Sequence, residues 1–179
     1  MQAFRDTSDG YGVISKSFHW LMAFLFAWQF GGAMLRLAET ENAVQAFMWS
    51  THQPVGFTLW GLAFLRACWG IFNWRNRPHH TGSSVQVRLI GAAHMVMYLL
   101  MLVVPSLAIL RGIGSGRGLS IYGIDVLQPT GVQVDFLVTP ANILHGWLAW
   151  LLLVLIAGHV FMAMYHQLVR KDGTLSKMV

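Results

Sequence analysis

The chain contains four apolar runs, each long enough to cross a bilayer, and this feature limits its fold more than any other. A helix crosses the hydrocarbon core of about 30 Å in about 20 residues. The runs lack the period-two alternation of a membrane β-barrel, so helices are the structure that can satisfy their backbone in lipid. We therefore expect an all-α integral membrane four-helix bundle, in one domain over residues 1–179. The predicted spans cover residues 18–35, 54–74, 89–110 and 143–165.

Composition agrees with a membrane protein and excludes several other classes. Hydrophobic residues make up 55% of the chain and charged residues only 11%, whereas an ordinary soluble domain is about a quarter charged. A single cysteine excludes a disulfide-stapled domain. The net charge of +5 does not indicate nucleic-acid binding, because the 12 Lys and Arg residues are spread along the chain and suit contact with lipid headgroups. The first apolar run starts late and lacks a clear cleavage site, so we expect it to be retained.

Basic residues are concentrated on one side of the predicted bundle. That side has Arg5, Lys16, Arg75, Arg77, Arg88, Arg170, Lys171 and Lys177, and the other has Arg36, Arg111 and Arg117. The positive-inside rule then places both termini in the cytoplasm. Residues 111–140 then form an exported loop. This loop either covers a site as a lid or simply connects two spans.

Five histidines lie within or at the edge of the apolar runs, where polar residues are functional candidates. His145 and His159 are fourteen residues apart, nearly four helical turns, so they share one face about 21 Å apart along the axis. With antiparallel neighbours, His19 lies level with His159, and His52 lies level with His145. The spacing predicts two facing pairs at two depths. Two imidazoles from facing helices are what a six-coordinate haem iron needs.

Arg66 and His94 are the other polar candidates inside the membrane. Arg66 follows His52 at the same interval of fourteen residues, at the depth of His19 and His159, and either binds a haem propionate or extends to the headgroups. His94 lies near the depth of His19 and His159. It either replaces His19 as a ligand, binds a propionate, handles a proton at a quinone site, or joins two helices by a hydrogen bond.

Other residues fit simpler interpretations. Gly31 and Gly32 make room for a macrocycle or for helix packing. A zinc site is not expected, because no cysteine or carboxylate accompanies the histidine pairs. A haem-free proton or metal transporter with a histidine relay is an alternative that explains the pairing at two depths less well. Cys68 is assigned to packing, His79, His80 and His166 to solvent or headgroups, and Trp20, Trp49, Trp74 and Trp147 to an interfacial belt.

Several segments resemble the bacterial cytochrome b561 family. They are YGVISKSFHWLMA near the start, GAAHMVMYLL in the third span, NILHGWLAWLLLVLIAGHVFMAMYH in the fourth and KDGTL after it. The resemblance runs from Tyr11 to about Met178. It implies two b haems with bis-histidine iron. The family's histidine ligands fall on His19, His52, His145 and His159, its second-span arginine on Arg66, and its third-span histidine on His94.

The resemblance also implies a function. It predicts electron transfer in the bacterial inner membrane with ubiquinone as one partner, in the manner of a family member that oxidises superoxide to oxygen and reduces ubiquinone. Arg36, Arg111 and Arg117 would attract superoxide, although acidic residues on the same side weaken that field. The alternative is a non-catalytic haem-containing anchor, or a quinol-linked carrier that serves a separate periplasmic redox protein.

Overall fold

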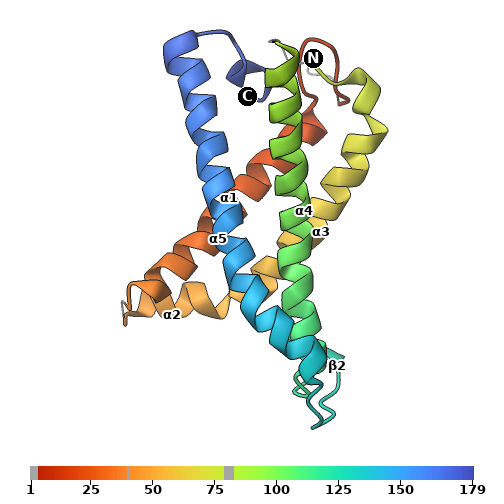
Figure 1. Ribbon diagram of the computed structural model, residues 1–179, viewed down its shortest axis with the longest axis vertical. Helices are drawn as coiled ribbons and strands as arrows, with labels where there is room; N and C mark the ends of the chain where they lie inside the picture. Colours follow the sequence, from red (N-terminus) through yellow and green to blue (C-terminus); the bar gives the residue numbers. More distant parts are fainter. Residues whose placement is uncertain (1–3, 40, 79–82) are drawn as a thin grey trace.

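The computed structural model describes residues 4–39, 41–78 and 83–179. His79 and His80 lie outside the described residues. Four helices are long and apolar enough to cross a membrane, which confirms the expected all-α four-helix membrane bundle (Figure 1). The helical elements are α1 (Val13–Leu37), α2 (Ala43–Ser50), α3 (His52–Phe72), η1 (Trp74–Asn76), α4 (Ser84–Gly114), α5 (Asp135–Tyr165), η2 (His166–Arg170) and η3 (Leu175–Lys177). The strands are β1 (Leu119–Ile121) and β2 (Ile124–Leu127).

The helices α4 and α5 are longer than the apolar runs that predicted them. Each has 31 residues, which corresponds to about 46 Å, well beyond the hydrocarbon thickness. The expectation that residues 111–140 form a loop is therefore wrong, because α4 continues to Gly114 and α5 begins at Asp135. Outside the hydrocarbon core, polar residues end an apolar run without ending the helix. In Figure 1, α4 and α5 extend past the other helices at the bottom of the view.

A β-hairpin occupies the middle of that connection. Strands β1 and β2 pair antiparallel, and the turn residues Tyr122 and Gly123 both have positive φ, which matches the right-handed twist of a tight hairpin. The hairpin is attached to the start of α3. Gln53 Nε2 donates to the carbonyl of Ser120 at 2.9 Å, and the hydroxyls of Thr58 and Tyr122 are 2.6 Å apart. The connection is thus partly ordered and lies against α3.

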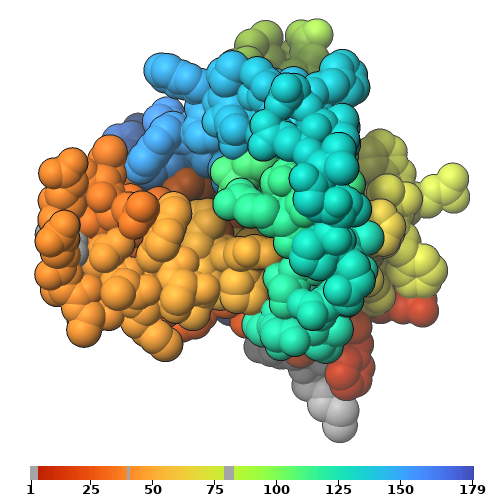
Figure 2. All heavy atoms as spheres, turned by 90° about the horizontal axis from the view of Figure 1, so that it is seen from below, coloured from red at the N-terminus to blue at the C-terminus, as the bar shows by residue number. Residues whose placement is uncertain are grey.

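The short helix α2 crosses the end of α1 and was not predicted from the sequence. Asn42 caps it by accepting a hydrogen bond from the backbone of Gln45. A Cβ atom at Gly31 or Gly32 would lie 3.2 or 3.1 Å from the Met48 side chain, so these glycines allow α2 to approach α1, as the helix-packing alternative predicts. Figure 2 shows α2, in orange, across this end of the molecule beside the hairpin in teal.

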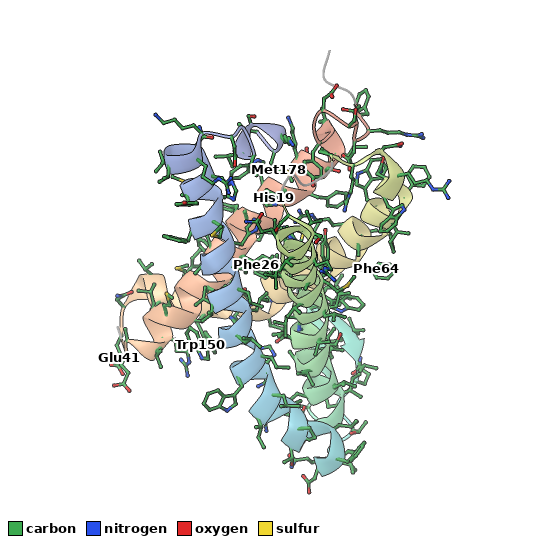
Figure 3. All side chains as sticks on the ribbon, turned by 45° about the horizontal axis from the view of Figure 1, so that its top comes forward. His19, Phe26, Glu41, Phe64, Trp150 and Met178 are labelled. Carbon is green, nitrogen blue, oxygen red and sulfur yellow. The ribbon has the colours of Figure 1, made fainter. Side chains whose placement is uncertain are left out.

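A layer of buried apolar side chains lies between the two depths of the predicted sites. Leu59, Ala63 and Leu152 are at most 2% exposed, and Leu152 is halfway along α5 between His145 and His159. Phe26, labelled in Figure 3, packs against the same core. The buried residues of this core cluster are Met22, Phe30, Leu59, Ala63, Met97, Leu100, Met101 and Leu152. Cys68, which was assigned to packing, lies exposed on the surface of α3.

The N-terminal and C-terminal segments lie at the same end of the bundle (Figure 1). The backbone N–H of Tyr11 donates to the carbonyl of Lys177 at 3.0 Å, and Trp20 Nε1 donates to the carbonyl of Met178 at 3.0 Å. Lys16 Nζ reaches the carbonyl of Val179 at 2.6 Å. Residues after α5 therefore fold back onto the start of α1. The cytoplasmic location of this end stays a prediction.

Candidate functional site

Two histidine pairs face each other across the bundle. The terminal-side pair is His19 of α1 and His159 of α5, with ring centroids 6.2 Å apart and ring planes at 71°. The hairpin-side pair is His52 of α3 and His145 of α5, with centroids 6.4 Å apart and planes at 69°. Figure 3 labels His19 on α1, near the end that carries both termini. The structure thus brings together the residues that helical spacing assigned to each depth.

The separations fit two imidazoles on opposite sides of one metal ion. A metal–nitrogen bond of about 2 Å and about 1 Å more to each ring centre place such centroids about 6 Å apart. The helix packing leaves space for such a group. The helix α5 packs closely on α4, whereas the backbone of α5 lies farther from α1 and α3, which carry the partner histidines. Among the described residues there is no cluster of three or more His, Cys, Asp or Glu residues that could hold a metal ion. Each pair therefore suits axial ligation of a planar macrocycle rather than a tetrahedral site.

A backbone hydrogen bond orients His145. Its Nδ1 atom lies 2.9 Å from the carbonyl oxygen of Val104 on α4. A carbonyl only accepts, so Nδ1 carries the hydrogen and the lone pair of Nε2 is free to bind a metal. This is the usual arrangement of a metal-ligating histidine, whose second nitrogen donates to a carbonyl or carboxylate. The bond orients the ring toward His52.

His94 lies close to the terminal-side pair but in a different geometry. Its ring centroid is 5.3 Å from that of His159, about 1 Å shorter than the separation that two axial ligands need. Its Nδ1 lies 2.8 Å from the carbonyl of Ile90 on its own helix. Of the two candidates opposite His159, His19 has the separation that fits axial ligation.

Arg66 points into the bundle beside the terminal-side pair. Its Nη2 atom is 3.1 Å from Nδ1 of His19, and its guanidinium lies 5.7 Å from the ring centre of Tyr98. An arginine only donates, so Nδ1 of His19 is the acceptor. A guanidinium has five N–H donors, and a buried one needs an anion or several acceptors. Arg66 is therefore placed to bind an anionic group next to His19.

The surroundings of His52 include Trp49 and Arg36, which were expected in other roles, and Gln29, for which no role was expected. Trp49 of α2 stacks on His52 with ring centres 4.8 Å apart and planes at 30°. The guanidinium of Arg36 lies 4.6 Å from the ring centre of Trp49. Gln29 Nε2 donates to the backbone carbonyl of His52 at 2.9 Å. These contacts were missed because α2 was not predicted and Trp49 was assigned to the interfacial belt.

Charged groups at the terminal end have structural partners. The Asp6 carboxylate accepts from the backbone of Gly12 at 2.9 Å and pairs with Arg77 at 3.4 Å. Burial raises the pKa of the nearby Tyr11 phenol, although the positive charge of Arg77 opposes this. These groups tie the N-terminal segment to the end of α3.

The KDGTL segment forms a hydrogen-bonded turn after α5. One Asp172 carboxylate oxygen accepts from Thr174, and the other lies 2.6 Å from Nδ1 of His166. Hydrogen bonds from Thr174 and His166 hold the pKa of the Asp172 carboxyl well below its usual range. His166, expected at the headgroups, therefore contacts this turn.

Comparison with known proteins agrees with the site. The sequence matches the family described as prokaryotic cytochrome b561 over residues 10–179. The chain belongs to this family. It is 32% identical to cytochrome b561 homolog 2 of Escherichia coli (strain K12) over 183 residues, which covers 99% of this chain and 95% of that protein. It is 25% identical to cytochrome b561 homolog 1 of the same organism, over 90% of this chain and 92% of that protein.

Membership of the cytochrome b561 family gives the site its chemistry. The chain is a multi-pass membrane protein that binds haem b and transfers electrons. The four intramembrane histidines and Arg66 fit this cofactor, because they offer paired imidazoles for the iron and a cation for a propionate.

Proposed function

We propose that this cytochrome b561 holds two b haems in the bacterial inner membrane, one at each histidine pair. His19 and His159 would bind one iron, and His52 and His145 the other. The observation that supports this is the pair of centroid separations, 6.2 and 6.4 Å, at two depths with the Leu152 layer between them. When bound, haem iron supplies one-electron chemistry by alternating between its ferric and ferrous states.

The protein's own residues orient and neutralise the cofactor. Val104 holds His145 in the tautomer with a free Nε2. Arg66 would hold a haem propionate, which would free Nδ1 of His19 from the guanidinium so that this atom could carry a hydrogen. His94 remains near this site for a proton or a propionate rather than as a ligand. The apolar layer excludes water between the two sites.

We further propose that the reaction oxidises superoxide and reduces ubiquinone. Two superoxide anions give two molecules of oxygen and two electrons, and ubiquinone takes up these electrons with two protons to form ubiquinol. Superoxide would react at the exported end, where Arg36 lies beside the hairpin-side pair and Arg111 lies close enough to both of its histidines to interact electrostatically. Quinone would dock nearer the terminal-side pair, where Arg66 and His94 offer polar contacts.

The test uses the purified full-length chain in lipid nanodiscs that contain ubiquinone. Superoxide is generated enzymatically, and ubiquinol formation is followed by absorbance after the haem content has been measured by the pyridine haemochrome method. Two haems per chain and superoxide-dependent ubiquinol formation are expected. Two haems without this activity would favour a carrier or membrane anchor that serves a separate periplasmic redox protein. A colourless protein would contradict both haem-based proposals.

A further inference from the structure

The residues Arg36, Trp49 and His52 form a continuous stack at the hairpin side of the bundle. The guanidinium of Arg36 lies 4.6 Å from the ring centre of Trp49, and the indole lies 4.8 Å from the His52 ring at an angle of 30°. They come from the last turn of α1, from α2 and from the first residue of α3. The stack therefore depends on α2 crossing the end of α1.

We propose that Trp49 and Arg36 are positioning residues that set the orientation and raise the redox potential of the haem held by His52. This inference rests on the proposed ligation of haem by His52. The first part follows from the stacking, because an indole stacked on an imidazole limits rotation of that imidazole about its side-chain bonds. The Val104 carbonyl orients the ring of His145, and at His52 the stacked indole takes this orienting role.

The second part follows from charge. A haem with ferric iron carries one more positive charge than the same haem with ferrous iron. A nearby guanidinium therefore stabilises the ferrous state and raises the midpoint potential. The Trp49 ring lies between Arg36 and His52 in this stack and, at 38% exposure, covers one face of that histidine from water. Arg36 itself is exposed, so water screens part of its charge and the expected shift in potential is small.

The surrounding contacts make α2 a rigid support for this stack. Trp28 Nε1 donates to the hydroxyl of Thr51 at 2.8 Å, and its ring contacts Phe47 edge-on with centroids 5.9 Å apart. Gly31 and Gly32 bring α1 against Met48. Removal of the Trp49 ring alone should therefore leave α2 in place.

The experiment measures both properties in the haem-loaded protein in nanodiscs. Potentiometric titration gives the midpoint potential of each haem, and the EPR spectrum of each low-spin ferric haem reports the angle between its imidazole planes. The variants are Arg36→Gln, Trp49→Leu and Trp49→Phe. Arg117→Gln is the control for loss of a positive charge at the same end of the bundle. Phe47→Leu is the control for loss of an aromatic side chain from α2.

We expect Arg36→Gln to lower the potential of one haem and to leave the other unchanged. Trp49→Leu should lower the same potential and also change the EPR spectrum of that haem, whereas Trp49→Phe should keep a spectrum close to the native one. Arg117→Gln and Phe47→Leu should do neither. If Arg36→Gln and Trp49→Leu match their controls, the inference is wrong.

A His52→Ala variant separates this inference from the haem assignment. Loss of one haem in His52→Ala, combined with no shift in Arg36→Gln, would overturn the positioning role alone. Retention of both haems in His52→Ala would overturn the ligand assignment and this inference with it. If Trp49→Leu fails to retain haem, the Arg36→Gln titration decides, because Arg36 lies at the outer end of the stack.

Discussion

The Nδ1 atom of His145 lies 2.9 Å from the carbonyl oxygen of Val104, so a backbone atom of α4 orients a candidate iron ligand of α5. This bond crosses the most extensive helix–helix interface of the structure. The carbonyl belongs to the residue before Pro105, inside α4. The α4–α5 pair therefore acts as a scaffold that presents His145 and His159 to the histidines of α1 and α3.

Replacement of the histidines should separate ligands from neighbours. His145→Ala and His159→Ala should each lose one of two haems, because one axial imidazole is removed. His94→Ala should keep both, since its 5.3 Å separation from His159 does not suit axial ligation. The measurement is the pyridine haemochrome count per chain. A His94→Ala variant with one haem, together with a His19→Ala variant with two, would make His94 the ligand.

Arg66 should stabilise the haem of the terminal-side pair. Its replacement by glutamine removes a buried positive charge, so we expect a lower midpoint potential for that haem and weaker haem retention. A hydrogen bond that involves a charged group contributes about 1.5–3 kcal/mol. Arg66→Lys keeps the charge but loses the planar fork and should be intermediate. Redox titration and thermal haem release provide the measurements, and equal behaviour of both variants and the native protein would rule out this role.

The angles between the histidine rings predict the EPR spectra of the haems. The planes in the two pairs are 71° and 69° apart, far from parallel. Low-spin ferric haems with nearly perpendicular imidazole planes give strongly anisotropic spectra, so both haems should show this type of signal in the oxidised protein. Spectra typical of parallel imidazoles would contradict the ring orientations described above.

The Asp172 turn should hold the C-terminal segment against α1 over the whole range of neutral and mildly acidic pH. Because hydrogen bonds lower the pKa of this carboxyl from its ordinary value of 3.8, its stabilising effect is fully present above that value and is lost as the pH falls below it. Asp172→Asn should therefore speed trypsin cleavage near Lys171 equally at pH 5.5 and pH 8. Asp9→Asn, at an exposed position, is the control and should leave the cleavage rate unchanged.

The length of the apolar runs was sufficient to predict the four spans, and helical periodicity was sufficient to predict the residues of the two histidine pairs. The interval from His145 to His159 determines that both rings share one face of α5, because the rotation per residue is a property of every α-helix. Antiparallel neighbours then place His19 and His52 at matching depths. These arguments depend on local backbone geometry, which apolar runs in a membrane enforce strongly.

The sequence was a poor guide outside the hydrocarbon core. Apolar runs ended before α4 and α5 did, so Gly114 and Asp135 were assigned to a loop, and α2 was not recognised in the connection after α1. In water or at headgroups, backbone hydrogen bonds continue without an apolar side chain to signal them. Short polar segments therefore carry little information about whether they are helical.

The sequence by itself determined the membrane helices, their approximate depths and the histidines that they carry, because periodicity and hydropathy are local properties of the chain. Only the tertiary structure decided what surrounds each histidine: Val104 at His145, Arg66 at His19, and Trp49 with Arg36 at His52. These contacts join residues from different helices. They depend on how α4 packs on α5 and how α2 crosses α1, and no spacing within one helix specifies that packing.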